Sequence, residues 1–272
     1  MIIDGRAIAR DIINRLKREA SPKKFLALVV VGGNAETESF VREKEKTAKA
    51  LGIDLRKYSF PLEITQDELR REVLKIAQHK TCGGTVVQLP LPGQINAQYV
   101  LNAVPREKDV DVLGERALGA FYAGRNTVNP PAVETIKEIL KVVGKENLGE
   151  AHAVIVGAGI LVGKPTSVWM QKKAATLSVL DKNTADKTLF LKDADLIISG
   201  VGVAGIVDAD KLKDSALVID FGYDATSGKL RGDLTPPEKE TGITYTPTPG
   251  GTGPILVAKL FENFFRLVQE QQ

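Results

Sequence analysis

Runs of apolar residues alternate with helical patterns along the first half of the chain. Residues 25–31 form an unbroken apolar stretch closed by Gly32 and Gly33, which predicts a buried parallel strand followed by a helix. Strands that alternate with helices indicate βαβ units with right-handed crossovers, so the first half is expected to form an α/β layer of its own. Further strands are predicted near 53–60 and 84–89, and helices near 66–78 and 97–103.

The second half repeats this alternation after a connecting region rich in Gly, Asn and Pro at residues 114–131, which is the best candidate for a domain boundary. Pro131 suits the first turn of a helix that ends near Val143. Residues 256–268 have apolar residues at helical spacing, and the pattern leaves open whether this helix packs back on the first domain. Short apolar strands are predicted at 153–156, 177–180, 196–199 and 216–219, which indicates a second parallel α/β domain.

The composition is that of a folded globular protein, with 43% hydrophobic and 26% charged residues in 272. The formal charge of +3 gives no support to a nucleic-acid partner. Cys82 is the single cysteine, and His79 and His152 match no metal-ligand spacing, so disulfide and metal scaffolds are excluded. Asp4 and Arg6 interrupt the segment where a signal peptide would be apolar, and no apolar run reaches membrane-span length, so a cytoplasmic protein is expected.

Lys44 is unusual in the predicted helix at residues 39–51. On a helical wheel it falls on the apolar side, four residues after Phe40, while most of the other charged residues lie opposite. Burial would lower the pKa of this amine and suit it to proton transfer near neutral pH. In the alternative interpretation, Lys44 extends along the helix edge to solvent.

Two other segments carry polar groups at positions that suit ligand binding. Gln88 ends a buried strand just before Leu89 and Pro90, and ligands of open α/β sheets collect at the carboxyl ends of strands. Asp109 and Asp111 are two residues apart, so an extended backbone points both carboxylates to one side, where they could bind a cation or accept N–H groups of a heterocycle. A solvated glutamine and a solvated acidic turn are the structural alternatives.

The predicted strand at 153–156 leads into a glycine turn with the spacing G-x-G-x-x-x-G. Such a turn brings backbone N–H groups to a phosphate at the start of a helix, and Asp181 follows at the distance of an acid that binds ribose hydroxyls. A dinucleotide site or a purely structural turn would explain the pattern. The turn comprises Gly157, Ala158, Gly159, Ile160, Leu161, Val162 and Gly163.

Residues 247–254, Pro-Thr-Pro-Gly-Gly-Thr-Gly-Pro, combine fixed φ angles with residues that permit positive φ. The segment is therefore expected to be a loop and not a helix or central strand. The loop either presents its backbone to a ligand or connects rigidly to the last helix.

Taken in order, these motifs resemble the bifunctional methylenetetrahydrofolate dehydrogenase / methenyltetrahydrofolate cyclohydrolase family over nearly the whole chain. The resemblance rests on the ordered set and not on any single motif. The matching segments are Ile3-Asp4-Gly5-Arg6-Ala7-Ile8-Ala9, Phe40-Val41-x-x-Lys44-x-Lys46, Val87-Gln88-Leu89-Pro90-Leu91-Pro92, Lys108-Asp109-Val110-Asp111, Val162-Gly163-Lys164-Pro165, Ile219-Asp220-Phe221-Gly222 and Pro249-Gly250-Gly251-Thr252-Gly253-Pro254.

The resemblance implies a role for particular residues. Lys44 matches the catalytic lysine, Gln88 the amide that hydrogen-bonds and tunes it, and Asp111 the carboxylate that holds the pterin ring. Substrate binding is expected from Phe40, Leu89, Pro90, Pro249, Gly250 and Gly251. Cofactor binding is expected from Gly157, Ala158, Gly159, Val162, Gly163, Asp181, Lys182 and Tyr223, and no metal is expected.

The resemblance also implies the architecture and the activity. It implies two α/β domains with a cleft between them: a folate-binding domain at 1–130, completed by a C-terminal helix at 255–272, and a Rossmann-type nucleotide-binding domain at 131–254. It implies oxidation of methylenetetrahydrofolate, hydrolysis of the methenyl product, and a homodimer. The alternatives are a folate-binding or regulatory homologue without turnover, and a Rossmann dehydrogenase for an unrelated small substrate.

Departures from the family pattern bear on the cofactor and the substrate. NADP is implied by the resemblance, but Ala158 and Gly159 replace the usual Arg and Ser, and Asp181 would repel a 2′-phosphate, so NAD is also open. Phe40 replaces the usual Tyr, which keeps an aromatic face and removes a hydroxyl.

Overall fold

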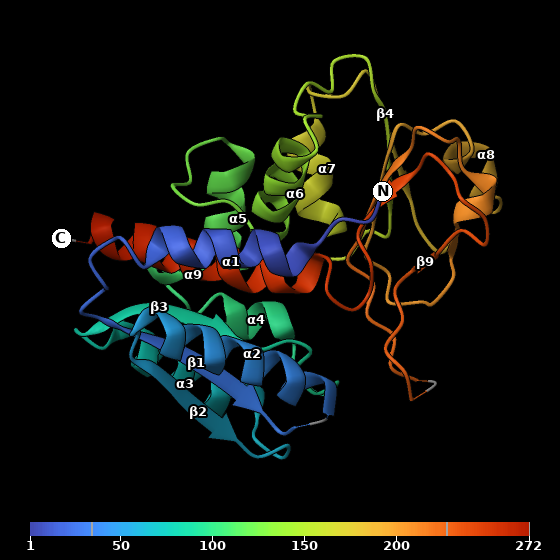
Figure 1. Ribbon diagram of the computed structural model, residues 1–272. Coiled ribbons are helices and arrows are strands. Elements are labelled where there is room, and N and C mark those ends of the chain that lie inside the picture. Colours follow the sequence, from blue (N-terminus) through green and yellow to red (C-terminus); the bar gives the residue numbers. More distant parts are fainter. Residues whose placement is uncertain (34, 227, 272) are drawn as a thin grey trace. The chain divides into compact units, whose positions relative to one another are not determined.

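The structure is a computed structural model that describes residues 1–33, 35–226 and 228–271. The chain divides into two compact units, and Figure 1 labels their α-helices and some of their strands. The three-stranded unit runs from Arg10 to Pro131 and from Val257 to the C-terminal end. The five-stranded unit comprises Met1–Ala9 and Ala132–Leu256.

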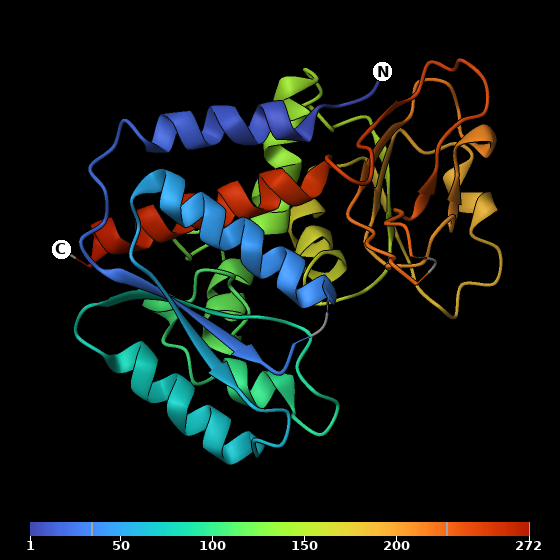
Figure 2. The ribbon, with the colours of Figure 1, turned by 60° about the horizontal axis from the view of Figure 1, so that its bottom comes forward.

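The three-stranded unit is a parallel sheet of order β2-β1-β3. The strands are β1 (Phe25–Val31), β2 (Leu55–Phe60) and β3 (Cys82–Val87), joined by α2 (Ala35–Leu51) and α3 (Gln66–Gln78). Because β2 and β3 flank β1 on opposite sides, right-handed crossovers place α2 and α3 on opposite faces of the sheet, as Figure 2 shows. All seven residues of β1 are buried, as expected for a strand covered on both faces.

The C-terminal helix α9 (Thr252–Glu270) contributes its Val257–Glu270 part to this unit and packs beside β3. A Cβ atom at Gly83 would lie 2.6 Å from Val268, and one at Gly84 would lie 2.9 Å from Phe264, so the two glycines permit this close packing. The remaining helical elements are α4 (Ala97–Leu101), the 3₁₀ helix η1 (Arg106–Lys108), α5 (Glu115–Tyr122), and α1 (Gly5–Leu16), which begins in the five-stranded unit.

The five-stranded unit is a parallel sheet of order β10-β8-β6-β4-β5. Since β4 comes first and has β5 on one side and β6 on the other, the strand order reverses at β4, as in doubly wound dinucleotide-binding sheets. The elements are α6 (Pro131–Val142), β4 (His152–Val156), α7 (Gly163–Met170), β5 (Thr176–Leu180), α8 (Thr188–Leu191), β6 (Leu196–Ser199), β7 (Val207–Asp208), η2 (Ala209–Lys211), β8 (Leu217–Asp220), β9 (Leu234–Thr235) and β10 (Thr244–Tyr245).

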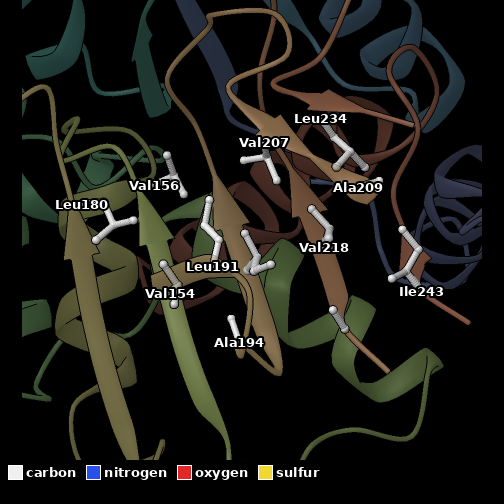
Figure 3. Packing of buried hydrophobic residues seen from close by; sticks show 12 residues of the cluster. Val154, Val156, Leu180, Leu191, Ala194, Val207, Ala209, Val218, Leu234 and Ile243 are labelled. Atoms are coloured by element: carbon white, nitrogen blue, oxygen red, sulfur yellow. The ribbon is translucent and has the colours of Figure 1, made fainter. Parts of the chain in front are cut away.

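One face of this sheet is covered by a cluster of buried apolar side chains, shown in Figure 3. Val154, Ile197 and Val218 stand on the three central strands and are fully buried. Leu191 of α8 and Val207 of β7 pack against them from outside the sheet. Because Val207 of β7 packs in this cluster, the chain that follows β6 is held against the sheet by close packing.

The structure corrects four expectations. The connecting region contains helix α5, and helix α1 lies in a segment for which the pattern predicted no element. Residues 1–9 belong to the five-stranded unit, because the Met1 amine donates to the Ile243 carbonyl (2.6 Å) and Ile3 N–H donates to the Tyr245 carbonyl (2.9 Å). Helix α9 begins at Thr252, so residues 252–254 are helical; Pro254 is tolerated because the first turn needs no backbone donor there.

Within the described part of the chain, no helix is both long enough and apolar enough to cross a membrane.

Candidate active site

Lys44 lies on α2 and is buried, with 9% of its surface exposed. Val41 and Ala48, one turn away on either side, are also buried, so the helix presents the lysine on its core-facing side. The side chain does not extend to solvent: its Nζ donates a hydrogen bond to Gln88 Oε1 at 2.7 Å. The wheel-based prediction of an inward-facing amine is therefore confirmed, and the solvent-reaching alternative is wrong.

Gln88 follows the last residue of β3 and is buried. Its backbone N–H donates to the Val29 carbonyl at 2.9 Å, which extends the β1–β3 pairing by one residue. The side-chain Nε2 donates to the Leu89 carbonyl at 2.7 Å, which leaves Oε1 facing Lys44. Since β1 and β3 meet where the strand order reverses, Gln88 stands at the carboxyl edge where such sheets bind ligands.

Asp111 is half-buried and interacts electrostatically with Lys44. Burial raises the pKa of Asp111, and the nearby Lys44 opposes that rise. Burial also lowers the pKa of Lys44, and Asp111 opposes that fall. The site therefore holds, beside Asp111, an amine that gives up its proton more readily than an exposed lysine does.

Asp109 and Asp111 have different surroundings, although the sequence treats them as one pair. Asp109 is buried, and its Oδ2 accepts the backbone N–H groups of Leu113 (3.0 Å) and Gly114 (2.7 Å). Burial raises the pKa of Asp109 to about 7. Asp111 accepts no hydrogen bond from the residues that the structure describes, so of the two carboxylates it is the one available to a ligand.

The other predicted substrate-binding residues of this unit lie nearby in sequence and fold. Phe40 is half-buried on α2, one turn before Lys44. Leu89 is half-buried and Pro90 is exposed in the loop after β3, and the peptide bond between them is cis. The three-stranded unit thus brings together Lys44, Gln88 and Asp111, and Phe40, Leu89 and Pro90 are their near neighbours along the chain.

The glycine turn of the five-stranded unit follows β4 at the reversal of strand order. Gly157 has φ +102°, a conformation that favours glycine, and a Cβ there would lie 3.2 Å from the Gly200 carbonyl oxygen after β6. A Cβ at Gly163 would lie 1.9 Å from the Gly157 carbonyl oxygen, so the first residue of α7 must also be glycine. Ala158 and Gly159 are exposed, which leaves the backbone of the turn open to a phosphate.

Asp181 directly follows β5, beside this turn. Leu180 pairs with Val156, and Gly157 N–H donates to the Leu180 carbonyl at 2.8 Å, so Asp181 and the glycine turn share one edge of the sheet. Asp181 Oδ1 accepts the Asn183 N–H at 2.8 Å, which orients the Asp181 carboxylate. Lys182 is exposed in the same turn, and Tyr223 is half-buried after β8.

Two carboxylates that the sequence motifs did not assign hold the loops after β6 and β8. Asp220 accepts N–H groups from Gly222, Asp233 and Leu234, and burial raises its pKa to about 6. Asp233 accepts the Ser199 hydroxyl (2.6 Å) and the N–H groups of Val201 (2.7 Å) and Val203 (2.9 Å). The segment Ile219-Asp220-Phe221-Gly222 was recognised as a motif, but only the fold shows this bracing role.

The loop at Pro249, Gly250 and Gly251 also lies in the five-stranded unit. Thr248–Pro249 is a cis peptide bond and Gly250 has φ +99°. A Cβ at Gly5 would lie 1.8 Å from the Gly251 carbonyl oxygen, so the start of α1 and this loop are in direct contact. Within the described residues, no group of three or more His, Cys, Asp or Glu side chains could hold a metal ion.

Comparison with known proteins covers both units. A family model described as tetrahydrofolate dehydrogenase/cyclohydrolase, catalytic domain, matches residues 3–111. A second model, described as the NAD(P)-binding domain of the same enzymes, matches residues 130–272. The first range contains Lys44, Gln88 and Asp111, and the second contains the glycine turn and Asp181.

Individual relatives agree with these models. The chain is 34% identical to the bifunctional protein FolD of Wolbachia sp. subsp. Drosophila simulans (strain wRi), over 97% of this chain and 93% of that protein. The crystal structure of the FolD methylenetetrahydrofolate dehydrogenase/cyclohydrolase from Campylobacter jejuni matches with a TM-score of 0.92 and 30% identity, over 100% and 99% of the two chains. The Trypanosoma brucei enzyme, complexed with NADP and an inhibitor, matches with a TM-score of 0.92 and 29% identity, over 100% and 98%.

Proposed function

Because this chain belongs to the tetrahydrofolate dehydrogenase/cyclohydrolase family, we propose that it oxidises methylenetetrahydrofolate with a nicotinamide cofactor and hydrolyses the methenyl product to formyltetrahydrofolate. The observation that carries this proposal is the hydrogen bond from the buried Lys44 amine to Gln88, with Asp111 beside it. A lysine held in this way is suited to proton transfer, which hydrolysis requires and folate binding alone does not.

The first reaction needs alignment more than acid–base chemistry. A bound nicotinamide cofactor supplies the hydride acceptor, and the bridging methylene of the folate becomes a cationic methenyl group without loss of a proton. Asp111 holds the pterin ring through its unoccupied carboxylate oxygens, and Phe40 offers an aromatic face to it. The protein therefore contributes to this step mainly by positioning the substrate.

The second reaction needs a proton carrier. Water attacks the methenyl carbon, forming a carbon–oxygen bond, and the neutral Lys44 amine accepts the proton that the water releases. The carbon–nitrogen bond of the ring then breaks while the new hydroxyl group loses its remaining proton to water and becomes the formyl carbonyl, and the Lys44 ammonium returns the first proton to the departing nitrogen. Gln88 Oε1 accepts a Lys44 N–H throughout, which holds Nζ in place. Because burial lowers the pKa of Lys44, the neutral amine that this step requires forms more readily than it would on an exposed lysine.

The residues of the five-stranded unit fit a dinucleotide. The exposed turn at Ala158 and Gly159 precedes α7, whose N-terminal end favours an anionic pyrophosphate. In this proposal Asp181, which follows β5 at the same edge of the sheet, accepts the ribose hydroxyls of the adenosine half. Val201 and Val203 are exposed on the loop that Asp233 braces, and they offer an apolar surface at the same edge.

Purified protein is expected to reduce NAD or NADP only when methylenetetrahydrofolate is supplied, and to consume methenyltetrahydrofolate without cofactor. Absorbance of the reduced nicotinamide and of the methenyl group measures the two steps separately. Failure to reduce either cofactor would reject the dehydrogenase activity. Calorimetric binding of folate without turnover would instead support a regulatory homologue.

We expect tighter binding of NAD than of NADP, since Asp181 would repel a 2′-phosphate and Ala158 offers no positive charge to it. The affinity ratio is expected to favour NAD by about tenfold or more, which corresponds to about 1.4 kcal/mol. Titration calorimetry with each dinucleotide measures this ratio without substrate.

The Asp181→Ser variant is expected to bring the two affinities closer together. Asp193→Asn is the control, because Asp193 is an exposed acid outside this turn. Equal affinities in the unmodified protein, or an unchanged ratio in Asp181→Ser, would remove Asp181 from cofactor selection.

We further propose that the protein acts in the cytoplasm and forms a homodimer through its nucleotide-binding unit. The support is the family resemblance together with β5, an edge strand of the five-stranded sheet on which Thr176 and Val179 are exposed.

A further inference from the structure

Asp109 is a buried carboxylate that the reaction as described does not use. It follows η1, and its backbone bridges to Thr85 of β3, so its position is fixed relative to the strand that carries Gln88. Lys108, the preceding residue, donates to the Ala77 carbonyl at the end of α3 (2.6 Å). The start of the segment from Asp109 to Gly114, which we call the acid turn, is thus attached to both β3 and α3.

The acid turn has a conformation that its own sequence does not favour. Val112 has φ +58°, in the left-handed region that β-branched residues rarely adopt, and its side chain is fully buried. Such a conformation persists only where surrounding interactions impose it. The Val112 N–H donates to the Asp109 carbonyl oxygen at 3.3 Å, which closes the turn at its first residue.

The Asp109 side chain supplies two of these interactions. A single oxygen, Oδ2, accepts the N–H groups of Leu113 and Gly114, the two residues directly after the left-handed position. A Cβ at Gly114 would lie 3.2 Å from this oxygen, so the absence of a side chain there permits the contact. On the opposite side, Asn263 of α9 donates to the Val110 carbonyl at 3.0 Å.

Asp111 lies at the centre of the acid turn, between these attachments. Its backbone is held on both sides, while its carboxylate accepts no hydrogen bond from the described residues and faces the charge of Lys44. Because no hydrogen bond from the described residues fixes this carboxylate, its position depends on the backbone of the acid turn and on the attraction of Lys44.

We propose that Asp109 is a positioning residue, which holds the acid turn and thereby directs the Asp111 carboxylate to the pterin ring beside Lys44. The inference rests on the proposed folate-binding role of Asp111. It assigns the two acids of one motif to two separate tasks: one binds the backbone of the protein, and the other binds the substrate.

A double-mutant cycle tests this coupling, with folate affinity measured by calorimetry in the absence of cofactor. Asp109→Ala is expected to weaken folate binding about tenfold, and Asp111→Ala by at least as much. Because Asp109 acts through Asp111, the double variant should bind no more weakly than Asp111→Ala alone. Additive losses would overturn the positioning role while leaving Asp111 as the folate ligand. No loss in Asp111→Ala would reject both the proposed role of Asp111 and the inference.

Two further variants separate positioning from simple loss of folding. Asp109→Asn can place its single amide oxygen where Oδ2 stands and accept both N–H groups, so it should retain most of the affinity. Weak binding by this variant with an intact fold would contradict the hydrogen-bond argument. Thr65→Ala, which removes the N-cap of α3 in the same unit, should lower the melting temperature without changing folate affinity.

If Asp109→Ala does not fold, Gly114→Ala replaces it in the cycle. The added methyl group would press on Asp109 Oδ2 while leaving the carboxylate present. The same non-additivity with Asp111→Ala is expected, and additive losses would again overturn the inference.

Discussion

Replacing Lys44 by methionine is expected to lower the rate of methenyltetrahydrofolate hydrolysis by about 100-fold or more, the usual contribution of a positioned acid–base group. The dehydrogenase reaction should fall much less, because no proton leaves the substrate in that step. Rapid mixing with methenyltetrahydrofolate measures the first activity, and coupled reduction of the nicotinamide cofactor measures the second. Unchanged hydrolysis would remove Lys44 from its catalytic role.

Two matched variants show whether the amine acts by proton transfer or only by charge. Lys44→Arg keeps a positive charge that does not release its proton, so it should fail in hydrolysis as completely as the methionine variant. Lys46→Met changes an exposed lysine on the same helix and should leave both reactions unaffected. Full hydrolysis by Lys44→Arg would show that a fixed charge is sufficient.

Lys44→Met, which is expected to lower activity, is not expected to lower the stability of the fold. Burial lowers the pKa of Lys44 in the folded protein, so the unfolded chain binds its proton more tightly, and this contribution to stability increases as the pH rises toward the unfolded pKa. At neutral pH the buried amine therefore costs stability. Lys44→Met should unfold at the same or a higher temperature than the unmodified protein, although Gln88 Oε1 loses its donor. A large drop in melting temperature would indicate a structural role instead.

Replacing Asp111 by alanine is expected to reduce both reactions together, because the two share one bound pterin. Two hydrogen bonds to a carboxylate contribute about 2 kcal/mol each, so their loss corresponds to a fall of roughly 1000-fold in kcat/KM for each reaction. Steady-state kinetics with methylenetetrahydrofolate and with methenyltetrahydrofolate provide the two values. The exposed Glu107, in the preceding turn, offers Glu107→Gln as the control.

The two variants thus give different patterns. Lys44→Met should separate the activities, while Asp111→Ala should lower them in parallel. Since Asp111 accepts no hydrogen bond from the described residues and burial raises its pKa, its removal should not destabilise the fold. Loss of only one activity in Asp111→Ala would contradict its assignment as the residue that holds the pterin.

Much of this protein can be predicted from local pattern. The continuous apolar stretch of β1 predicted a strand buried on both faces, and the alternation of strands with helices predicted parallel sheets. The position of Lys44 among apolar neighbours predicted its burial, because helical periodicity alone determines which face a residue occupies. The strand-ending position of Gln88 similarly placed it at the carboxyl edge of the sheet.

Other features are invisible at short range. Helix α5 lies in a segment whose Gly, Asn and Pro content indicated a connection, and tertiary packing of Ala117 and Phe121 outweighed that composition. Residues 1–9 join the five-stranded unit because the Met1 amine bonds to Ile243, 242 positions away. No local pattern specifies such a partner.

The sequence by itself determined the element types, the inward face of α2 and the ordered motifs that place the chain in its family. Only the tertiary structure decided which polar atoms meet. It paired Lys44 Nζ with Gln88 Oε1 across 44 residues, and it gave Asp109 and Asp111 different surroundings, although their spacing alone presents them as one pair. The physical reason is that periodicity selects a face, whereas a hydrogen bond requires two particular atoms at one distance, and chain folding alone brings them there.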